Sequence, residues 1–329
     1  MNFATVSTIV AIVLSVAGVY FAWKQVQIAR STRTGQEDAA LGESPDSSSS
    51  TLKRRTDVLA DIRENGVLRV GCLWYPPFIE FTQQGEKVVA KGLYPTMLDH
   101  VASQNGLHVE YQILRWDIAI EAINRRQVDV VACVLQSGKR RESCDFCGSL
   151  YRVGVGGVVR ADQEKIKRHE DLTNPELRIA VTKGEIGWEY AERYLNPKQG
   201  LFRFTVVADT EITRMMNLVV SRDVDIALAD SLSCAQYIEH ARAEGNNLLD
   251  IFASFPLHVE ENSLMIAKDQ DDFRCWLSEG LYLARSMPGV IAMEEQISKQ
   301  WPCVLIKVPT DGRAPCPPTS VVASRNSNA

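Results

Sequence analysis

The chain has 329 residues, of which 45% are hydrophobic, enough for one large core or for two small domains. Its formal net charge is −5, so the overall field of the molecule does not favour binding to nucleic acid. The five histidines lack the spacing of metal ligands, and the sequence has no Walker, GxGxxG or HExxH motif. Composition and motifs therefore predict no metal site, no cofactor and no nucleic-acid partner.

The N-terminal run Phe3–Trp23 is uncharged and predominantly apolar, and at about 20 residues it is long enough to cross a bilayer as a helix. A cleaved signal peptide fits less well, because no Lys or Arg precedes the run and no clear A-x-A site follows it. The sequence therefore predicts an uncleaved transmembrane anchor over residues 1–24. Lys24, Arg30 and Arg33 follow the run, and the positive-inside rule taken alone places the rest of the chain in the cytoplasm.

Two segments have too little apolar content to fold by themselves. Residues 25–51 are polar and include four consecutive serines at 47–50, so we expect a flexible linker. Residues 310–329 contain Pro, Ser and Asn, and we expect a disordered tail. The folded part is therefore predicted to lie between residues 52 and 309.

The folded part begins with an aromatic segment after its first strand. Val67–Gly71 reads as that strand, and Trp74–Phe78 follows it with two prolines. From the residues alone, Tyr75 is interpreted as a core residue, and Trp116, which starts a later helix, as packing at that helix start. Aromatic faces provide contact area and also attract an ammonium group.

The stretch Val128–Tyr151 combines a strand with a basic cluster. Its first half is apolar and bounded by charge, which predicts a buried strand. Ser137 and the cluster Lys139–Arg141 follow where that strand ends, and open α/β sheets bind ligands beyond the carboxyl ends of their strands. Arg140 at such a place holds a carboxylate through two hydrogen bonds. The alternative is that the basic residues form a solvated turn.

Polar residues also follow two strands of the C-terminal half. Leu177–Val181 is a predicted strand, and Gly184 and Glu185 lie in the turn before a helix over 188–194. The unpaired N–H groups of a helix N-terminus suit an anion. Asp230 ends a second predicted strand, where one role open to it is that of a helix N-cap.

Eight cysteines are many for an ordinary cytosolic protein. Cys144 and Cys147 form a C-x-x-C pair, a spacing compatible with structural thiols, a disulfide, a redox couple or half of a zinc site. Cys275 and Cys303 flank the last helical region and are also placed to pair with each other.

The order of these motifs resembles that of the extracellular solute-binding proteins of the polar amino-acid uptake family. The first motif is D-I-x-x-x-G-x-L-R-V-G followed by Y-P-P-F, and the second is a Trp that opens a helix. The third is a strand with an Asp, then an Arg, a Phe and a Tyr, carried here by Asp129, Arg140, Phe146 and Tyr151. The resemblance spans residues 56–301.

The resemblance implies a two-lobed α/β fold like that of the type 2 periplasmic binding proteins, with the ligand cleft between the lobes. Residues 52–155 and 252–309 are then expected to form lobe 1, and residues 156–251 lobe 2. The Gly-rich run Val153–Val159 is expected to be an extended crossover whose glycines tolerate hinge motion. A ligand that touches both lobes favours their closed arrangement.

The resemblance also assigns roles in the cleft. It implies that Arg140 binds a ligand carboxylate and Asp230 a ligand ammonium, with Tyr75 and Trp116 as aromatic walls. Ser137, Gly184 and Glu185 complete the expected ligand-binding residues. From this assignment, Arg140→Ala is expected to abolish binding and leave the fold intact.

Four of the positions that depart from the family pattern bear on the site or on a turn. Leu135 stands where a Thr often assists the Arg, and Arg126 stands where Gly is usual. Glu185 and Ile186 replace the usual hydroxyl residues, so either Glu185 points away from the cleft or the ligand carries a cationic group.

These features predict a membrane-anchored solute-binding protein without catalytic residues. Its expected ligand is a small polar or charged solute, with amino acids as the leading class, and its expected partner is the permease of an ABC-type transporter. The resemblance places the soluble part in the periplasm or outside the cell, against the positive-inside rule. Two alternatives are a sensing or interaction module without transport and a cyclohexadienyl-dehydratase-like lyase in which Glu185 is the general acid.

Overall fold

The computed structural model describes residues 57–195, 204–207, 212–301 and 305–308. The predicted anchor, linker and tail lie outside these ranges. No helix of the described residues is long and apolar enough to cross a membrane. The described residues belong to one compact unit that starts at Thr56.

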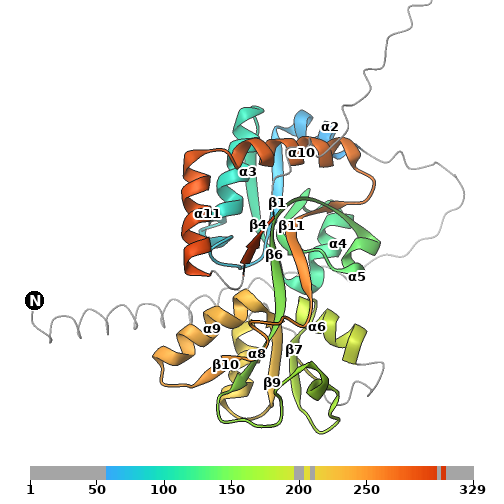
Figure 1. The fold of residues 1–329 in the computed structure, drawn as a ribbon. Coiled ribbons are helices and arrows are strands. Elements are labelled where there is room, and N and C mark those ends of the chain that lie inside the picture. The colour runs from blue at the N-terminus through green and yellow to red at the C-terminus, as the bar shows by residue number, and fades with distance from the viewer. Residues whose placement is uncertain (1–56, 196–203, 208–211, 302–304, 309–329) are drawn as a thin grey trace, which may run out of the picture. The chain divides into compact units, whose positions relative to one another are not determined.

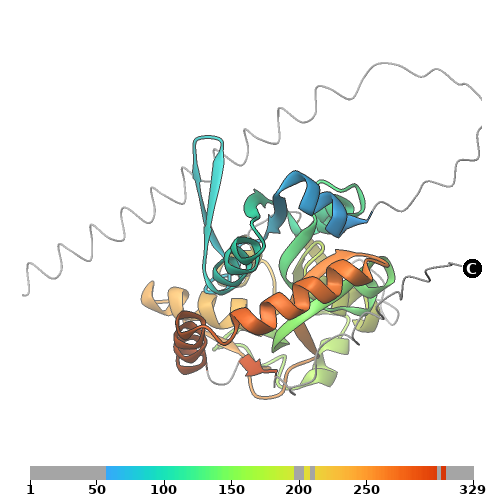
Figure 2. The ribbon, with the colours of Figure 1, turned by 90° about the horizontal axis from the view of Figure 1, so that it is seen from above.

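One lobe contains residues from both ends of the described chain. Its strands are β1 (Val67–Cys72), β4 (His108–Ile113), β5 (Val130–Leu135), β11 (Val259–Ala267) and the first part of β6 (Cys144–Arg160). Its helices are α2 (Val58–Asn65), α3 (Leu93–Gln104), α4 (Ala119–Asn124), α5 (Gly138–Ser143), α10 (Asp271–Ala284) and α11 (Pro288–Gln300), with the 3-10 turn η1 (Trp116–Ile118). The strand order is β4-β1-β5-β11-β6, with β4 and β5 parallel to β1 and β11 antiparallel to its neighbours. A hairpin of β2 (Glu80–Gln84) and β3 (Lys87–Lys91) projects from this lobe (Figure 2).

Helices cover both faces of this sheet, which explains the uninterrupted apolar sequence of β5. All six residues of β5 are buried, and successive side chains of a strand point to opposite faces. Val130 and Ala132 pack with residues of α2, α3, α10 and α11, whereas Val131 packs with residues of α4. Val134 also packs with residues of α4, because the left-handed backbone of Cys133 interrupts the alternation.

The second lobe has its own sheet. Its strands are β7 (Ile179–Thr182), β8 (Phe204–Val207), β9 (Ile226–Asp230), β10 (Leu248–Asp250) and the last part of β6. Its helices are α6 (Ile186–Tyr190), α8 (Ile212–Val220) and α9 (Ser231–Ala243), with the 3-10 turn η2 (His169–Thr173) and the π-type turn η3 (Ala191–Leu195). The order is β6-β9-β7-β8, with β10 also on β6. Residues of α8 and α9 pack on one face, and residues of η2 and η3 pack on the other.

The strand β6 belongs to both sheets (Figure 1). Its residues Cys144–Gly154 pair with β11, and Val155–Val158 pair with β9. Along the edge of β6 opposite β11, β12 (Leu305–Lys307) pairs with Tyr151–Val153. The two-lobed α/β fold implied by the resemblance is therefore present, while the residue boundaries expected for the lobes stay a prediction.

The Gly-rich run expected as a crossover lies in β6, and close packing explains its composition. A Cβ on Gly154 would lie 2.5 Å from Cβ of Pro256, and one on Gly156 would lie 2.4 Å from Oδ2 of Asp250. At Gly157 a Cβ would lie 2.7 Å from Cδ1 of Ile226. The strand therefore has no room for side chains at these positions, and the hinge role of the glycines stays a prediction.

The backbone conformation shows why Gly suits the position that Arg126 occupies in this chain. Arg126 has a φ of 60°, in the left-handed region that Gly adopts without strain. Arg126 follows the C-terminus of α4, where its carbonyl accepts a hydrogen bond of 2.8 Å from Nη1 of Arg69. The usual Gly of the family therefore fits the geometry of this turn better than the Arg present here.

Candidate ligand-binding site

An enclosed cavity lies where side chains of the two lobes meet. It is lined by Tyr75, Trp116, Cys133, Leu135, Arg140, Glu185, Ile186 and Asp230. Five of these residues (Tyr75, Trp116, Arg140, Glu185 and Asp230) are among the seven predicted from the sequence. Its volume of about 10 Å³ is roughly the room that one water molecule needs. The lobes are thus closed on each other, and any larger ligand requires them to separate.

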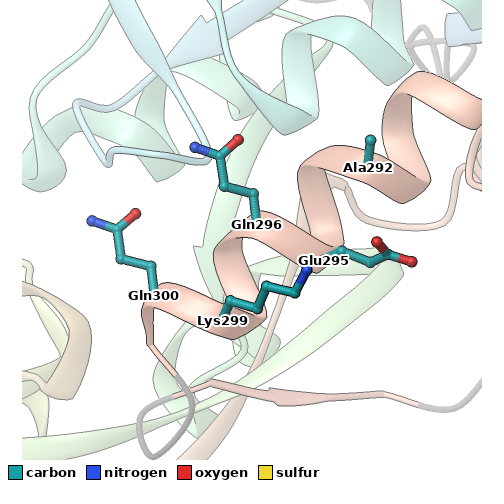
Figure 3. A pocket seen from close by; sticks show the side chains of 5 residues that line it. All are labelled: Ala292, Glu295, Gln296, Lys299 and Gln300. Carbon is teal, nitrogen blue, oxygen red and sulfur yellow. The ribbon is translucent and has the colours of Figure 1, made fainter.

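A larger hollow lies on the surface of α11 and is a poor candidate for a specific site. Its volume is about 510 Å³, and Figure 3 shows its lining of Ala292, Glu295, Gln296, Lys299 and Gln300. All five residues are exposed and come from one helix. Such a surface offers no desolvated polar group that would fix the orientation of a ligand.

Arg140 is buried and connects the two lobes. Its Nη1 donates to the carbonyl of Leu135 at 2.7 Å, and its Nη2 donates to the carbonyl of Gly184 at 2.8 Å. Its Nε lies 3.0 Å from Oε1 of Glu189, and the two side chains are only 4% and 10% exposed. Every nitrogen of the guanidinium therefore already has a partner in the protein.

The sequence left open whether the basic cluster is a solvated turn or part of the site, and the structure shows that its residues differ in this respect. Lys139 and Arg141 are mainly solvated, with side chains 59% and 54% exposed. Only Arg140 turns inward, because Ser137 caps α5 by accepting a hydrogen bond from the Arg140 amide at 3.2 Å. The cap fixes the direction in which Arg140 leaves the end of β5.

Tyr75 and Asp230 meet across the lobe boundary. The hydroxyl of Tyr75 donates to Oδ1 of Asp230 at 2.6 Å, and both residues are buried. Oδ1 of Asp230 also accepts from the amide of Ser233 at 2.9 Å, so Asp230 is the N-cap of α9. The N-cap role left open by the sequence is therefore confirmed, and it coexists with a position in the cavity wall.

Glu185 points into the site and not away from it. Its Oε2 accepts from the amide of Gly187 at 2.6 Å, which caps α6, and its Oε1 accepts from the amide of Asp230 at 3.1 Å. Burial, and then the nearby Asp230 carboxylate, raise the pKa of Glu185 to about 8. Burial also raises the pKa of Asp230. Glu185 therefore favours retaining its proton at neutral pH.

The remaining predicted residues lie at the edge of this arrangement. The ring centroid of Trp116 is 5.6 Å from Cζ of Arg140, and Trp116 begins η1, as its helix-start interpretation expects. Its role as an aromatic wall for a ligand stays a prediction. Gly184 has a φ of 81°, and a Cβ there would lie 3.0 Å from the amide of Asp117. Gly184 thus packs against the other lobe and binds Arg140 through its carbonyl, while Ser137 acts through the α5 cap.

Two residues of the site were missed by sequence reasoning. Glu189 lies four positions after Glu185, and this helical spacing is the signal that could have found it. Cys133 lies within β5 with a φ of 64°, at a register irregularity between β5 and β11. Burial raises the pKa of the Cys133 thiol well above its usual range, so the thiol is neutral.

A pH dependence follows from Glu185. Its carboxyl has an ordinary pKa near 4.5 when the chain is unfolded and about 8 in the closed structure, so the folded state binds more protons between these values. The stabilisation is therefore complete below pH 4.5 and is lost as the pH rises through 8. We expect the melting temperature to fall between pH 5 and pH 8 and Glu185→Gln to flatten that slope; equal slopes for both proteins would contradict the prediction.

Gly187 is expected to tolerate no side chain. A Cβ at this position would lie 2.1 Å from the carbonyl oxygen of Leu228, a backbone atom of β9 next to the site. Gly187→Ala is expected to destabilise the protein by about 1–3 kcal/mol, measured by urea unfolding. Gly289→Ala is the matched control, because nothing lies within 4 Å of its Cβ and alanine favours the helix α11. Equal stability of the two variants would refute the steric explanation.

The C-x-x-C cysteines do not pair with each other. Cys144 and Cys147 are free, buried residues of β6, and their side chains belong to cores on opposite faces of the sheet. Burial raises the pKa of Cys144 to about 11 and that of Cys147 to about 12, which leaves both thiols uncharged. Cys275 is disulfide-bonded, and Cys303, its partner suggested by the sequence, lies outside the described residues.

The fold and the converging side chains can now be compared with known proteins. Residues 68–290 match the model of the bacterial extracellular solute-binding proteins, family 3. The chain belongs to this family. The resemblance drawn from the sequence motifs is therefore confirmed, and the family consists mostly of binding proteins without enzymatic activity.

Individual relatives are more distant. The L-cystine-binding protein TcyA of Bacillus subtilis (strain 168) is 28% identical over 135 residues, which are 41% of this chain and 50% of TcyA. The chain thus spans about half the length of this curated relative.

Among solved structures, a cysteine-binding protein from Campylobacter jejuni superposes with a TM-score of 0.63 at 16% identity, covering 77% of this chain and 100% of the other. AncCDT-1, an ancestral amino-acid-binding protein and precursor of cyclohexadienyl dehydratase, gives 0.59 at 22% identity, with coverage of 74% and 99%. These structural likenesses establish the fold alone.

Proposed function

We propose that this chain captures a small polar or charged solute by closing its two lobes around it. The observation that supports this proposal is one buried cavity at the lobe boundary, which is lined by Arg140, Tyr75, Glu185 and Asp230. These residues come from both lobes, so a ligand among them contacts both and favours the closed state. Amino acids are the leading class of ligand to test, because the family and the named relatives support them.

We further propose that the chain is held at a membrane by residues 1–24 and delivers its solute to the permease of an ABC-type transporter. The extracellular family supports a periplasmic or external position of the folded part. The disulfide at Cys275 supports the same position, because disulfides persist in oxidising compartments. Loss of cellular uptake of the bound solute on deletion of the chain is the expected result, and unchanged uptake would argue for a sensing role.

The binding proposal is tested by thermal denaturation of the purified chain with individual amino acids, small carboxylates and amines. A ligand at a hundredfold excess over its Kd stabilises the native state by about 2.7 kcal/mol and raises the melting temperature. We expect a hit to disappear in Asp230→Asn and to persist in Lys299→Ala, whose side chain lines the surface hollow on α11. A hit that survives in both variants would place the ligand elsewhere.

One observation also favours a lyase as the second candidate. Glu185 is a buried carboxyl whose pKa of about 8 keeps it protonated at neutral pH, as a general acid requires. AncCDT-1 links this fold to a cyclohexadienyl dehydratase. Product release from prephenate or arogenate, lost in Glu185→Gln, is the result that would support the lyase, whereas recovery of unchanged substrate would exclude it.

A further inference from the structure

The charge of Arg140 is neutralised inside the closed cleft by Glu189. The two side chains are almost fully buried and approach to 3.0 Å, and Glu189 comes from α6 of the other lobe. The protein itself therefore supplies a carboxylate to the guanidinium that a ligand carboxylate would need.

A ligand carboxylate has to displace this internal one. Glu189 is attached to the same chain, so it competes for Arg140 at an effective concentration on the order of mM. Displacement also leaves Glu189 without its ion-pair partner in a buried place, which is unfavourable. Positions 135 and 186, where the family pattern has hydroxyl residues, offer a ligand no hydroxyl, because Leu135 and Ile186 line the cavity there.

The other polar groups of the cleft accept hydrogen bonds from a cation. A bound ammonium group takes the place of the proton that Glu185 retains in the empty cleft. Each oxygen of the resulting carboxylate then has a free lone pair, because each accepts only one backbone N–H. Oε2 of Glu189 is buried and has no hydrogen-bond partner among the described residues. The faces of Tyr75 and Trp116, which line the cavity, also suit an ammonium group.

We infer that Glu189 is a specificity-determining residue. Because it neutralises the charge of Arg140, the cleft selects a small amine over the α-amino acid that differs from that amine only by a carboxylate. The inference rests on the proposed function, because it takes the closed cleft to be the ligand site. The ammonium group lies against Glu185 and Asp230, and the amine needs no contact with Arg140.

The test uses matched pairs of ligands that differ by one carboxylate: histamine and histidine, cadaverine and lysine, agmatine and arginine, and cysteamine and cysteine. Isothermal titration calorimetry on the full chain is expected to give at least a tenfold tighter Kd for the amine in the pair that binds. Glu189→Gln is expected to strengthen binding of the amino acid at least tenfold and to change binding of the amine less than threefold, because it frees the charge of Arg140.

Glu192→Gln is the matched control. It also removes a carboxylate, but one whose ion pair of 2.9 Å with Lys139 is exposed. It is expected to leave the preference between amine and amino acid unchanged. If Glu189→Gln does not fold, the affinities of the wild-type protein for the amine and for the amino acid still test the inference.

A wild-type preference for the amino acid overturns the inference while the proposed function stands, and so does an amino-acid affinity that Glu189→Gln leaves unchanged. Absence of binding by every member of every pair, together with a thermal screen that gives no hit for a protein shown to be folded, overturns both.

Discussion

Arg140→Ala is expected to destabilise the closed protein by about 3–5 kcal/mol, because it leaves the buried carboxylate of Glu189 without its partner. The carbonyls of Leu135 and Gly184 lose their donors in the same step. Since the lobes separate to hydrate Glu189, we also expect a larger radius of gyration by small-angle X-ray scattering. Sequence reasoning alone expected this substitution to leave the fold intact, and the buried ion pair adds the loss of stability.

Arg141→Ala is the control for this prediction. Its side chain is more than half exposed and lies 3.9 Å from Glu260, so its removal is expected to change the free energy of unfolding by less than about 0.5 kcal/mol. The double variant Arg140→Met with Glu189→Leu is expected to recover most of the loss, because no unpaired charge remains buried. Urea unfolding that gives equal values for Arg140→Ala and Arg141→Ala would show that the pair does not stabilise the closed state.

The second large effect is expected at Arg285, which lies far from the cleft. Nε of Arg285 is 2.7 Å from Oε1 of Glu294, and the two side chains are 7% and 2% exposed. The guanidinium also donates to the carbonyls of Leu150 and Val308, so it joins α10, α11, β6 and the residue after β12. Arg285→Ala removes this charged partner of the buried Glu294 carboxylate and is expected to cost about 3–5 kcal/mol.

Calorimetry is the direct measurement for Arg285→Ala. At about 2–4 °C per kcal/mol for a domain of this size, the melting temperature is expected to fall by roughly 10 °C. Arg274→Ala removes a more exposed partner of Asp271 on the same helix and is expected to leave the melting temperature within about 2 °C of the wild-type value. Similar melting temperatures for both variants would mean that Glu294 finds water or another partner when Arg285 is absent.

Sequence order was sufficient to predict which polar residues converge. Arg140 follows the end of β5, so the rule that ligands bind beyond strand ends identified it before its contacts were known. Asp230, which ends β9, was assigned through the resemblance. Tyr75 and Glu185 were found through the resemblance, and the structure places them in the same cavity wall. Their roles in ligand binding remain part of the proposal.

The partners of these residues could not be predicted, because they depend on how the lobes approach each other. Tyr75 and Asp230 are 155 residues apart, and no local pattern links them. The pairing of Arg140 with Glu189 depends in the same way on closure, although the spacing of Glu189 from Glu185 was visible. The C-x-x-C motif could not be interpreted until Cys144 and Cys147 were known to lie in a strand, where a spacing of three puts them on opposite faces.

The position of β11 between β5 and β6 has a consequence for how the chain is made. β5 and β6 are neighbours in sequence, yet each pairs with a strand that leaves the ribosome more than a hundred residues later. For on the order of 10 s of synthesis, the nascent chain therefore carries an unpaired edge on β5 and has to avoid pairing β5 directly with β6. The strands of the other sheet, which are β7, β8, β9 and the end of β6, are all synthesised before β11. The lobe that is second in the sequence is therefore the one that can be completed first.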